Sequence, residues 1–183
     1  MIRAFLGLEM PEEVRFELSL IQPRLPLPLA VEIDDLHLTL AFLGEQPEPV
    51  LEDLHFALES LEAPPFALRL LGTGIFGGDK PRAVWAGVSP EPALGALQAK
   101  VANCARRMGI TVAGGRFVPH VTLARARGRL TADEAAALSA GLQATAGFAT
   151  APFAVTEFAL FSSNPRRKGP RYDVLMRYPL TGG

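Results

Sequence analysis

The phrase His-x-Thr-Leu-Ala occurs twice in this chain, as HLTLA from residue 37 and as HVTLA from residue 120, 83 positions apart. The chain has only three histidines, so two of them begin the same phrase. Chance recurrence in a chain rich in leucine and alanine is one explanation. The other, which we favour, is a duplicated fold in which each half contributes one phrase to a shared site.

Strict alternation of side chains assigns the first phrase to two faces of a predicted strand over residues 36–43. His37, Thr39 and Ala41 fall on one face. Phe42 falls on the opposite face, together with the leucines. The strand therefore has one apolar face for the core and one face with an imidazole, a hydroxyl and a small methyl group.

The second phrase repeats this pattern in a predicted strand over residues 117–125. His120, Thr122 and Ala124 share one face, and strict alternation puts Arg125 on the other. In both phrases the small third residue leaves room for another group to lie against the strand. We therefore expect the two polar faces to form a concave surface.

Strand-like and helix-like segments alternate along the chain without a long linker. Thr131 and Glu134 have the spacing of a capping box at the start of one helix. This mixed order favours an α+β fold with largely antiparallel sheets, since a parallel sheet would need a helical crossover after each strand. We expect one domain over residues 1–183. Further strands are predicted over residues 2–8, 66–71, 82–88, 153–161 and 172–178, and helices after Pro11, over residues 48–62, after residues 89–92 and over residues 132–143.

Composition excludes several classes of protein. The net charge of -1 gives no overall attraction for nucleic acid, so an anionic ligand requires a local basic cluster. The single cysteine, Cys104, excludes an internal disulfide, and its place on an apolar helical stripe indicates core packing. His55 lies off the leucine stripe of its helix among acidic residues, so we interpret it as an exposed surface histidine. No segment approaches about 18 consecutive apolar residues and the start of the chain lacks a secretory signal, so we expect a cytoplasmic protein.

Two imidazoles and two hydroxyls on one surface favour general acid–base catalysis. Two histidines are too few ligands for zinc, and neither H-E-x-x-H nor G-x-S-x-G occurs in the chain. An imidazole can be an acid or a base near neutrality, and a displacement that moves two protons needs one of each. The hydroxyls of Thr39 and Thr122 could donate hydrogen bonds to phosphate oxygens. We predict that the site uses no metal and no cofactor.

The two tetrads, HLTL at 37–40 and HVTL at 120–123, resemble the signature of the two-histidine (2H) phosphoesterase superfamily. More closely, the chain is similar to the RNA 2′,3′-cyclic phosphodiesterases, also called 2′-5′ RNA ligases. The similarity runs nearly end to end, through RAFLGLEMPEEV, LHLTLAFLGE, PRAVWAGV, RFVPHVTLARAR and an S-x-x-x-x-x-x-G-x-x-Y stretch that ends at Tyr172. It implies a bilobal, pseudo-two-fold fold, in which two largely antiparallel sheets line a central cleft and the helices lie outside.

The resemblance also implies a reaction. A ribose 2′,3′-cyclic phosphate would be opened to a 2′-phosphate without a metal, with His120 activating water and His37 protonating the departing 3′ oxygen. The reverse reaction, with a 5′-hydroxyl in place of water, would be ATP-independent 2′-5′ ligation. The expected partners are RNA ends or nucleotides that carry a 2′,3′-cyclic phosphate, tRNA fragments among them. No protein partner or membrane is implied, so we expect a monomer.

Substrate contacts are predicted at Arg125 and Phe42, which occupy corresponding positions after the two tetrads. One half would then bind phosphate while the other packs or stacks on a base. A salt bridge on the back of the strand is the alternative for Arg125. The basic loop over residues 166–171 could attract an RNA backbone or form a solvated turn, and Trp85 and Phe117 could stack on bases or belong to the core.

Two alternatives to this function remain open from the sequence. One is a non-catalytic module that binds RNA or nucleotides in the same cleft. The other keeps the chemistry and changes the substrate, for example to a cyclic phosphate derived from ADP-ribose or to the 3′ end of an RNA that is trimmed.

Overall fold

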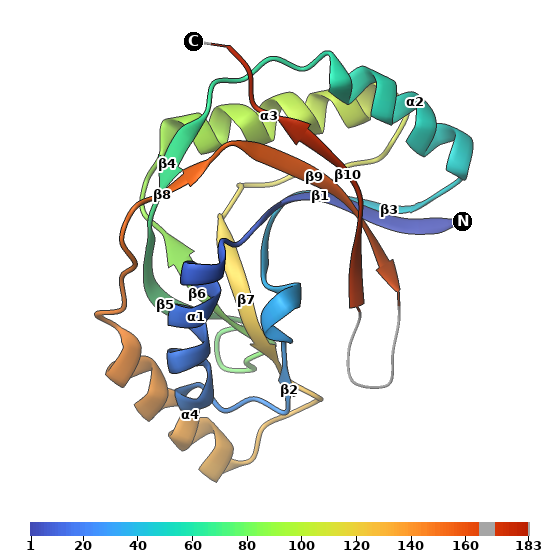
Figure 1. Cartoon of the computed structure of the whole chain (residues 1–183). Helices are drawn as coiled ribbons and strands as arrows, with labels where there is room; N and C mark the ends of the chain where they lie inside the picture. Colours follow the sequence, from blue (N-terminus) through green and yellow to red (C-terminus); the bar gives the residue numbers. More distant parts are fainter. Residues whose placement is uncertain (165–170, 183) are drawn as a thin grey trace.

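A large antiparallel sheet runs through the computed structural model, which describes residues 1–164 and 171–182 (Figure 1). The strands pair in the order β10-β9-β1-β3-β7-β6-β5, with the short β2 also paired to β7, and β4 and β8 form a separate two-stranded sheet. The strands are β1 (Ile2–Glu9), β2 (Leu29–Ala30), β3 (His37–Gln46), β4 (Phe66–Leu68), β5 (Leu70–Phe76), β6 (Ala83–Val88), β7 (His120–Arg125), β8 (Phe153–Val155), β9 (Glu157–Asn164) and β10 (Arg171–Pro179).

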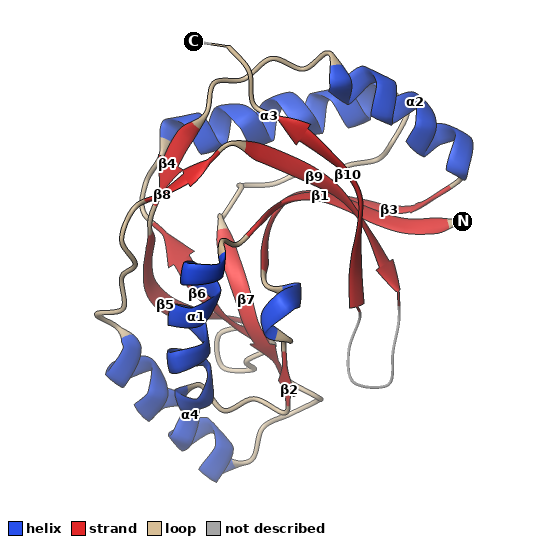
Figure 2. Cartoon of the chain, in the orientation of Figure 1, coloured by secondary structure: helices blue, strands red, loops and turns tan. Residues whose placement is uncertain are grey.

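Helices flank both halves of this sheet (Figures 1 and 2). In the described residues the α-helices are α1 (Glu12–Ile21), α2 (Glu48–Glu59), α3 (Pro92–Arg107) and α4 (Ala132–Thr145). The helices α2 and α3 lie along the half that contains β1 and β3, whereas α1 and α4 lie beside the half that contains β5, β6 and β7. The predicted α+β class is therefore confirmed. Among the helices of the described part of the chain, none combines the length and apolar character needed to cross a membrane.

The two sheets expected from the sequence are joined into one. The half β10-β9-β1-β3 meets the half β7-β6-β5 where β3 pairs with β7, through the single register pair Leu38 and Val121. Both residues are fully buried. This single pair is the place where the two strands that carry the His-x-Thr tetrads come together.

The helices form as the sequence predicted. Leu51, Leu54 and Leu58 are the buried stripe of α2. Cys104 is buried on α3, as expected from its place on the apolar stripe. Thr131 and Glu134 form the predicted capping box at the start of α4, where each side chain bonds to the other residue's backbone N–H.

The prediction that His55 is an exposed histidine is wrong. Its side chain is only 22% exposed, because α2 packs against β10. The imidazole Nδ1 lies 3.2 Å from the hydroxyl of Tyr178, and Nε2 lies 3.6 Å from a carboxylate oxygen of Glu59. The partner from β10 is 123 positions away, so local sequence gives no sign of it.

Candidate active site

The four tetrad side chains lie on the face of the sheet opposite the buried pair that joins the halves. Because the strands are antiparallel and Leu38 pairs with Val121, the register places His37 opposite Thr122 and Thr39 opposite His120. The two tetrads are therefore brought side by side where the halves of the sheet join.

An irregularity follows the threonine in the first tetrad. Along β1, the consecutive residues Leu6 and Gly7 pair with Ala41 and Thr39, so Leu40 is an extra residue in β3. One extra residue reverses the alternation of side chains beyond it. Ala41 and Phe42 therefore lie on the faces opposite those that strict alternation predicts, before a second extra residue, Leu43, shifts the register again.

The reversal brings Phe42 to the face that carries His37. The prediction that Ala41 shares this face is wrong, since Ala41 is 4% exposed and belongs to the core, whereas Phe42 is 59% exposed. Phe42 pairs with Phe5 of β1, and their rings lie 6.2 Å apart. An exposed aromatic ring therefore lies beside the tetrads.

The second tetrad contains the same irregularity at the same place. Val84 and Trp85 of β6 pair with Ala124 and Thr122, so Leu123 is an extra residue in β7. Ala124 is 1% exposed and lies in the core, contrary to prediction. The reversal brings the next residue, Arg125, to the face of the tetrads.

The position of Arg125 agrees with its electrostatic effects. Its positive charge lowers the pKa values of both His37 and His120, as expected for a cation on the face of the tetrads. The alternative of a salt bridge on the back of β7 depended on strict alternation, which the extra residue breaks.

Both imidazoles are held by a backbone carbonyl two residues earlier in the chain. The Nδ1 atom of His37 lies 2.7 Å from the carbonyl oxygen of Asp35, and the Nδ1 atom of His120 lies 2.7 Å from that of Val118. A carbonyl oxygen can only accept, so each Nδ1 carries the hydrogen. In the neutral ring Nε2 is then the unprotonated nitrogen, available to a ligand.

The ring of His37 is enclosed by three aromatic side chains. Its centroid lies 4.6 Å from that of Phe5, 5.9 Å from that of Phe161, and 4.6 Å from that of Tyr172, which meets it edge-on. Phe5 and Phe161 in turn stack on one another at 4.7 Å. These rings exclude water from the imidazole.

Exclusion of water lowers the pKa of His37 to about 4. Burial is the largest cause, because it penalises the charged imidazolium. The hydrogen bond to the Asp35 carbonyl raises the pKa and offsets part of this, while the charges of Arg125 and His120 lower it further. The free protein therefore holds His37 neutral at pH 7.

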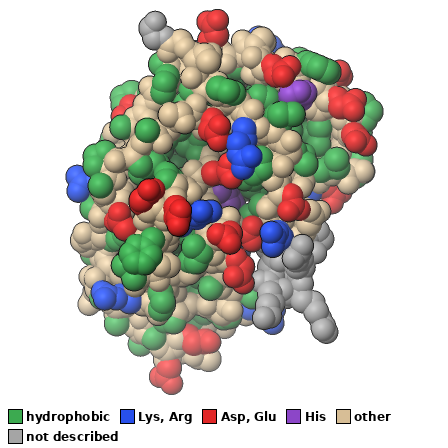
Figure 3. Space-filling model, viewed as in Figure 1, with side chains coloured by type: hydrophobic (Ala, Val, Ile, Leu, Met, Phe, Trp, Pro, Cys, Tyr) green, Lys and Arg blue, Asp and Glu red, His purple; other side chains and the backbone are tan. Residues whose placement is uncertain are grey.

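The ring of His120 is less enclosed. Phe76 meets it edge-on at 4.7 Å and Trp85 lies at 6.4 Å. Burial lowers the pKa of His120, the hydrogen bond to the Val118 carbonyl raises it, and the charge of Arg125 lowers it. Figure 3 shows a recessed histidine in the middle of one face of the molecule, bordered by basic and acidic side chains.

A pocket of about 290 Å³ opens directly beside the tetrads. It is lined by Thr39, Phe42, Phe76, Gln98, His120 and the loop over residues 112–118. Three aromatic rings and a polar amide next to an imidazole suit a flat, partly polar ring system such as a nucleobase.

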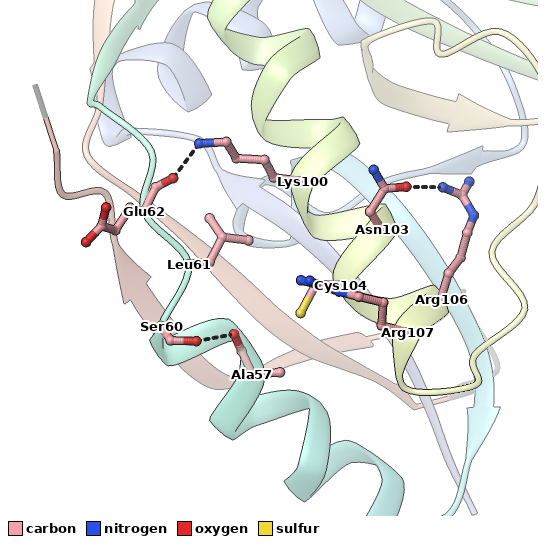
Figure 4. Close-up of a pocket in the computed structure, with 9 residues that line it drawn as sticks. All are labelled: Ala57, Ser60, Leu61, Glu62, Lys100, Asn103, Cys104, Arg106 and Arg107. Atoms are coloured by element: carbon pink, nitrogen blue, oxygen red, sulfur yellow. Dashed lines mark hydrogen bonds between the residues drawn. The ribbon is translucent and has the colours of Figure 1, made fainter.

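A larger pocket of about 770 Å³ lies between the end of α2 and α3 (Figure 4). Its lining includes Lys100, Arg106 and Arg107. Lys100 donates to the backbone oxygen of Glu62 at 2.6 Å, and Arg106 donates to the side chain of Asn103 at 2.9 Å. This pocket contains no imidazole, so the chemistry predicted from the sequence belongs at the tetrads.

Several site residues were not predicted from the sequence. The sequence does not distinguish three of them from other aromatic residues in strands, namely Phe5, Phe76 and Phe161. Tyr172 ended the family-like C-terminal stretch, but no role was predicted for it. What the sequence could not show is that these strands lie beside the tetrads.

The remaining candidate ligand contacts fall in different places. Trp85 lies on the tetrad face beside His120, and Phe117 lines the 290 Å³ pocket while also packing on the core. Of the basic loop, residues 166–170 lie outside the described residues. Arg171 begins β10 and lies 3.7 Å from a carboxylate oxygen of Asp173.

Comparison with known proteins finds a matching family model and similar chains. A family model described as the 2'-5' RNA ligase superfamily matches residues 14–167. A Thermus thermophilus protein named RNA 2',3'-cyclic phosphodiesterase is 35% identical over 197 aligned positions, which cover 99% of this chain and 91% of that protein. A Geobacillus stearothermophilus protein of the same name is 34% identical over 86% of this chain, and the chain spans about half (49%) of its length.

A solved structure has the same fold. The crystal structure of E. coli LigT complexed with 3'-AMP superposes with a TM-score of 0.78 at 29% identity, covering 99% of each chain.

Proposed function

The chain belongs to the 2'-5' RNA ligase superfamily, and from this premise we propose that it hydrolyses ribose 2′,3′-cyclic phosphates at the ends of RNA or of nucleotides, leaving a 2′-phosphate. One observation carries the proposal. Two imidazoles and two hydroxyls from distant parts of the chain share one face of the sheet, on the two strands that pair through Leu38 and Val121. The names of the relatives and the 3'-AMP bound to LigT support it.

In the proposed reaction the phosphorus atom lies between the two Nε2 atoms. His120 accepts a proton from water as the water oxygen bonds to phosphorus. The bond between phosphorus and the 3′ oxygen breaks, and His37 donates a proton to that oxygen. Atoms and charge balance because one proton is taken up and one is released, so the next turnover needs only a proton transfer that restores the two rings.

Thr39, Thr122 and Arg125 stabilise the phosphate in this proposal. The hydroxyls donate hydrogen bonds to the two non-bridging oxygens, which gain charge as water attacks. The guanidinium of Arg125 balances that charge from the same face. No metal ion or cofactor takes part.

The low pKa of His37 is compatible with its role as the acid. The phosphate of a bound substrate is an anion beside the imidazole, and an opposite charge at short range raises the pKa of a histidine. Substrate binding thus supplies the negative charge that favours the protonated ring. Without substrate the ring stays neutral.

The substrate's base occupies the pocket formed by Phe42, Phe76 and Gln98 in this proposal. RNA ends, tRNA fragments and nucleotides with a cyclic phosphate all present such a base. Ligation of a 5′-hydroxyl end through a 2′-5′ bond is the reverse of the same chemistry. We propose that the protein acts as a monomer in the cytoplasm.

The test is incubation with adenosine 2′,3′-cyclic phosphate and with an oligonucleotide that ends in a cyclic phosphate, in buffer with and without EDTA. We expect a 2′-phosphate product at the same rate in both buffers. Binding without product would instead favour a non-catalytic nucleotide-binding module. A 3′-phosphate product would contradict the assignment of the leaving oxygen, and strong inhibition by EDTA would contradict metal-independent chemistry.

A further inference from the structure

The carbonyl oxygens of the extra residues in the two tetrad strands accept hydrogen bonds from glutamine side chains. In β7, the carbonyl oxygen of Leu123 accepts from Nε2 of Gln22 at 2.7 Å. In β3, the carbonyl oxygen of Leu40 accepts from Nε2 of Gln98 at 3.3 Å. Gln22 begins the short 3-10 helix after α1, whereas Gln98 lies on α3. A glutamine amide therefore occupies the same place in both halves of the molecule, although it comes from a different helical segment in each.

The second extra residue of β3 is held in the same way. Leu43 has no partner in the register between β1 and β3, and its carbonyl oxygen accepts from Nε2 of Gln46 at 2.6 Å. The chain contains four glutamines, and the fourth, Gln143, is exposed on α4. Three of the four thus bind the carbonyl groups of extra residues in the strands that carry the tetrads. This recurrence indicates that the irregularities are specifically supported.

An extra residue needs a contact outside its strand pair to fix its place. The register between two strands can slip, because similar backbone bonds can form one residue further along. Leu40 and Leu123 are buried, at 3% and 0% exposed, where a carbonyl group without a hydrogen bond costs free energy. A slip would move the carbonyl group away from its glutamine. The hydrogen bond from the glutamine therefore favours the observed position of the extra residue.

The amide of Gln22 is the more constrained of the two. Its Nε2 also donates to the carbonyl oxygen of Val31 at 2.7 Å, so both of its hydrogens are used. The N–H of Val31 in turn donates to the carbonyl oxygen of Leu123 at 2.9 Å. Gln98 makes one longer bond and lines the 290 Å³ pocket. We therefore expect Gln22 to restrict β7 more strongly than Gln98 restricts β3.

We propose that Gln22 is a positioning residue, which fixes the extra residue of β7 and thereby holds Arg125 on the face of the tetrads. Gln98 has the same role in β3, where it holds Phe42. Arg125 and Phe42 each follow the extra residue by two positions. Since side chains alternate along a strand, a shift of the extra residue past them would turn both to the back of the sheet. The inference rests on the proposed function, which assigns Arg125 to the phosphate and Phe42 to the base.

The test consists of two double-mutant cycles, Gln22→Met with Arg125→Ala and Gln98→Met with Phe42→Ala, with kcat and KM measured on adenosine 2′,3′-cyclic phosphate. Methionine keeps the length of the side chain and removes the amide. We expect Gln22→Met to lower kcat/KM about tenfold and Gln98→Met about threefold, within the range for loss of a hydrogen bond. Each loss should fall on the same constant, kcat or KM, as in the alanine variant of its cycle. In the background of that alanine variant, the glutamine substitution should cost less than about twofold, because the residue that it positions is gone.

The crossed pairs are the matched controls. Gln22→Met with Phe42→Ala, and Gln98→Met with Arg125→Ala, join different halves of the site, so their costs should add in full. A role confined to stability would not distinguish the matched pairs from the crossed pairs. Gln143→Met changes the exposed glutamine of α4 and should leave kcat/KM unchanged.

A Gln22→Met enzyme within twofold of wild type would overturn the inference, and so would equal coupling in the matched and crossed pairs. Thermal unfolding checks that each variant folds, and if Gln22→Met does not, the cycle of Gln98 and Phe42 decides. If wild type shows no turnover, or if His37→Ala keeps it, the proposed function itself has failed. The same cycles read from the Kd for adenosine 2′-phosphate then decide whether the glutamines position Arg125 and Phe42, so the two failures are distinguishable.

Discussion

The two halves of the site share a tetrad and a strand irregularity, yet they enclose their histidines differently. In the first half, β1 places Phe5 beside Phe42 and Gly7 beside Thr39. In the second half, the large and small residues exchange places. There β6 places Ala83 beside Arg125 and Trp85 beside Thr122.

This exchange explains the different environments of the two imidazoles. Gly7 has no side chain beside the ring of Phe161, and the ring of His37 lies against Phe161 and Phe5. In the second half Trp85 fills the equivalent place and lies over the glycines of β5 and β6, so His120 stays more open. One duplicated backbone therefore places the two imidazoles in different surroundings, and burial lowers the pKa of both.

The most severe way to break this pair is to remove one imidazole. We expect His37→Ala and His120→Ala each to lower kcat by about 10²- to 10⁴-fold, since a positioned acid or base contributes that much. The assay is hydrolysis of adenosine 2′,3′-cyclic phosphate, with folding checked by thermal unfolding. His55→Gln, which changes the histidine outside the cleft, is the control and should keep wild-type turnover. Turnover within tenfold of wild type in either alanine variant would contradict the mechanism.

The burial of His37 should also make the free energy of unfolding depend on pH. Its pKa is about 4 in the folded protein and near 6.5 when unfolded, so the unfolded chain binds more protons on acidification. The contribution of neutral His37 to the free energy of unfolding is present in full above pH 6.5, and it is lost as the pH falls toward 4. The loss from this residue is about 3 kcal/mol between pH 7 and pH 4. Urea unfolding at both values should show that His37→Gln loses less stability than wild type by about that amount, and equal losses would contradict the environment described for His37.

Gly7, which pairs with Thr39, gives a third test of the difference between the two halves. A Cβ atom on Gly7 would lie 2.7 Å from the carbonyl oxygen of Leu38, so Gly7→Ala must push β1 and β3 apart next to His37. We expect a loss of about 2 kcal/mol in the free energy of unfolding, as for other overpacked sites, together with lower activity. Gly95→Ala on α3 has open space around it and should stabilise the protein by about 0.5 to 1 kcal/mol. Equal stability of the two variants would refute the close approach.

Much of this site follows from local sequence, and the rest depends on pairing between distant strands. Alternation correctly put His37 with Thr39 and His120 with Thr122, because these residues precede the irregularity in each strand. It failed for the two residues that follow each tetrad, because an extra residue in a strand is defined only by the register of its neighbour. Residues such as Tyr172, whose strand reaches the tetrads only through the order of the sheet, could be recognised as part of a family pattern but not assigned a place.

The pH dependence of turnover provides the finest comparison of the two halves. The reaction needs one imidazole protonated and the other neutral, and burial lowers the pKa values of both His37 and His120 below the usual 6.5. Above the higher of the two values, the population of this state falls as pH rises. For the free enzyme, kcat/KM should therefore be highest on the acid side of pH 6.5 and should fall about tenfold per pH unit between pH 7 and pH 9. Because bound phosphate raises both pKa values, the decline in kcat should begin at higher pH than the decline in kcat/KM. Coincident profiles, or a flat kcat/KM across this range, would show that the enclosure of the imidazoles does not control their protonation during catalysis.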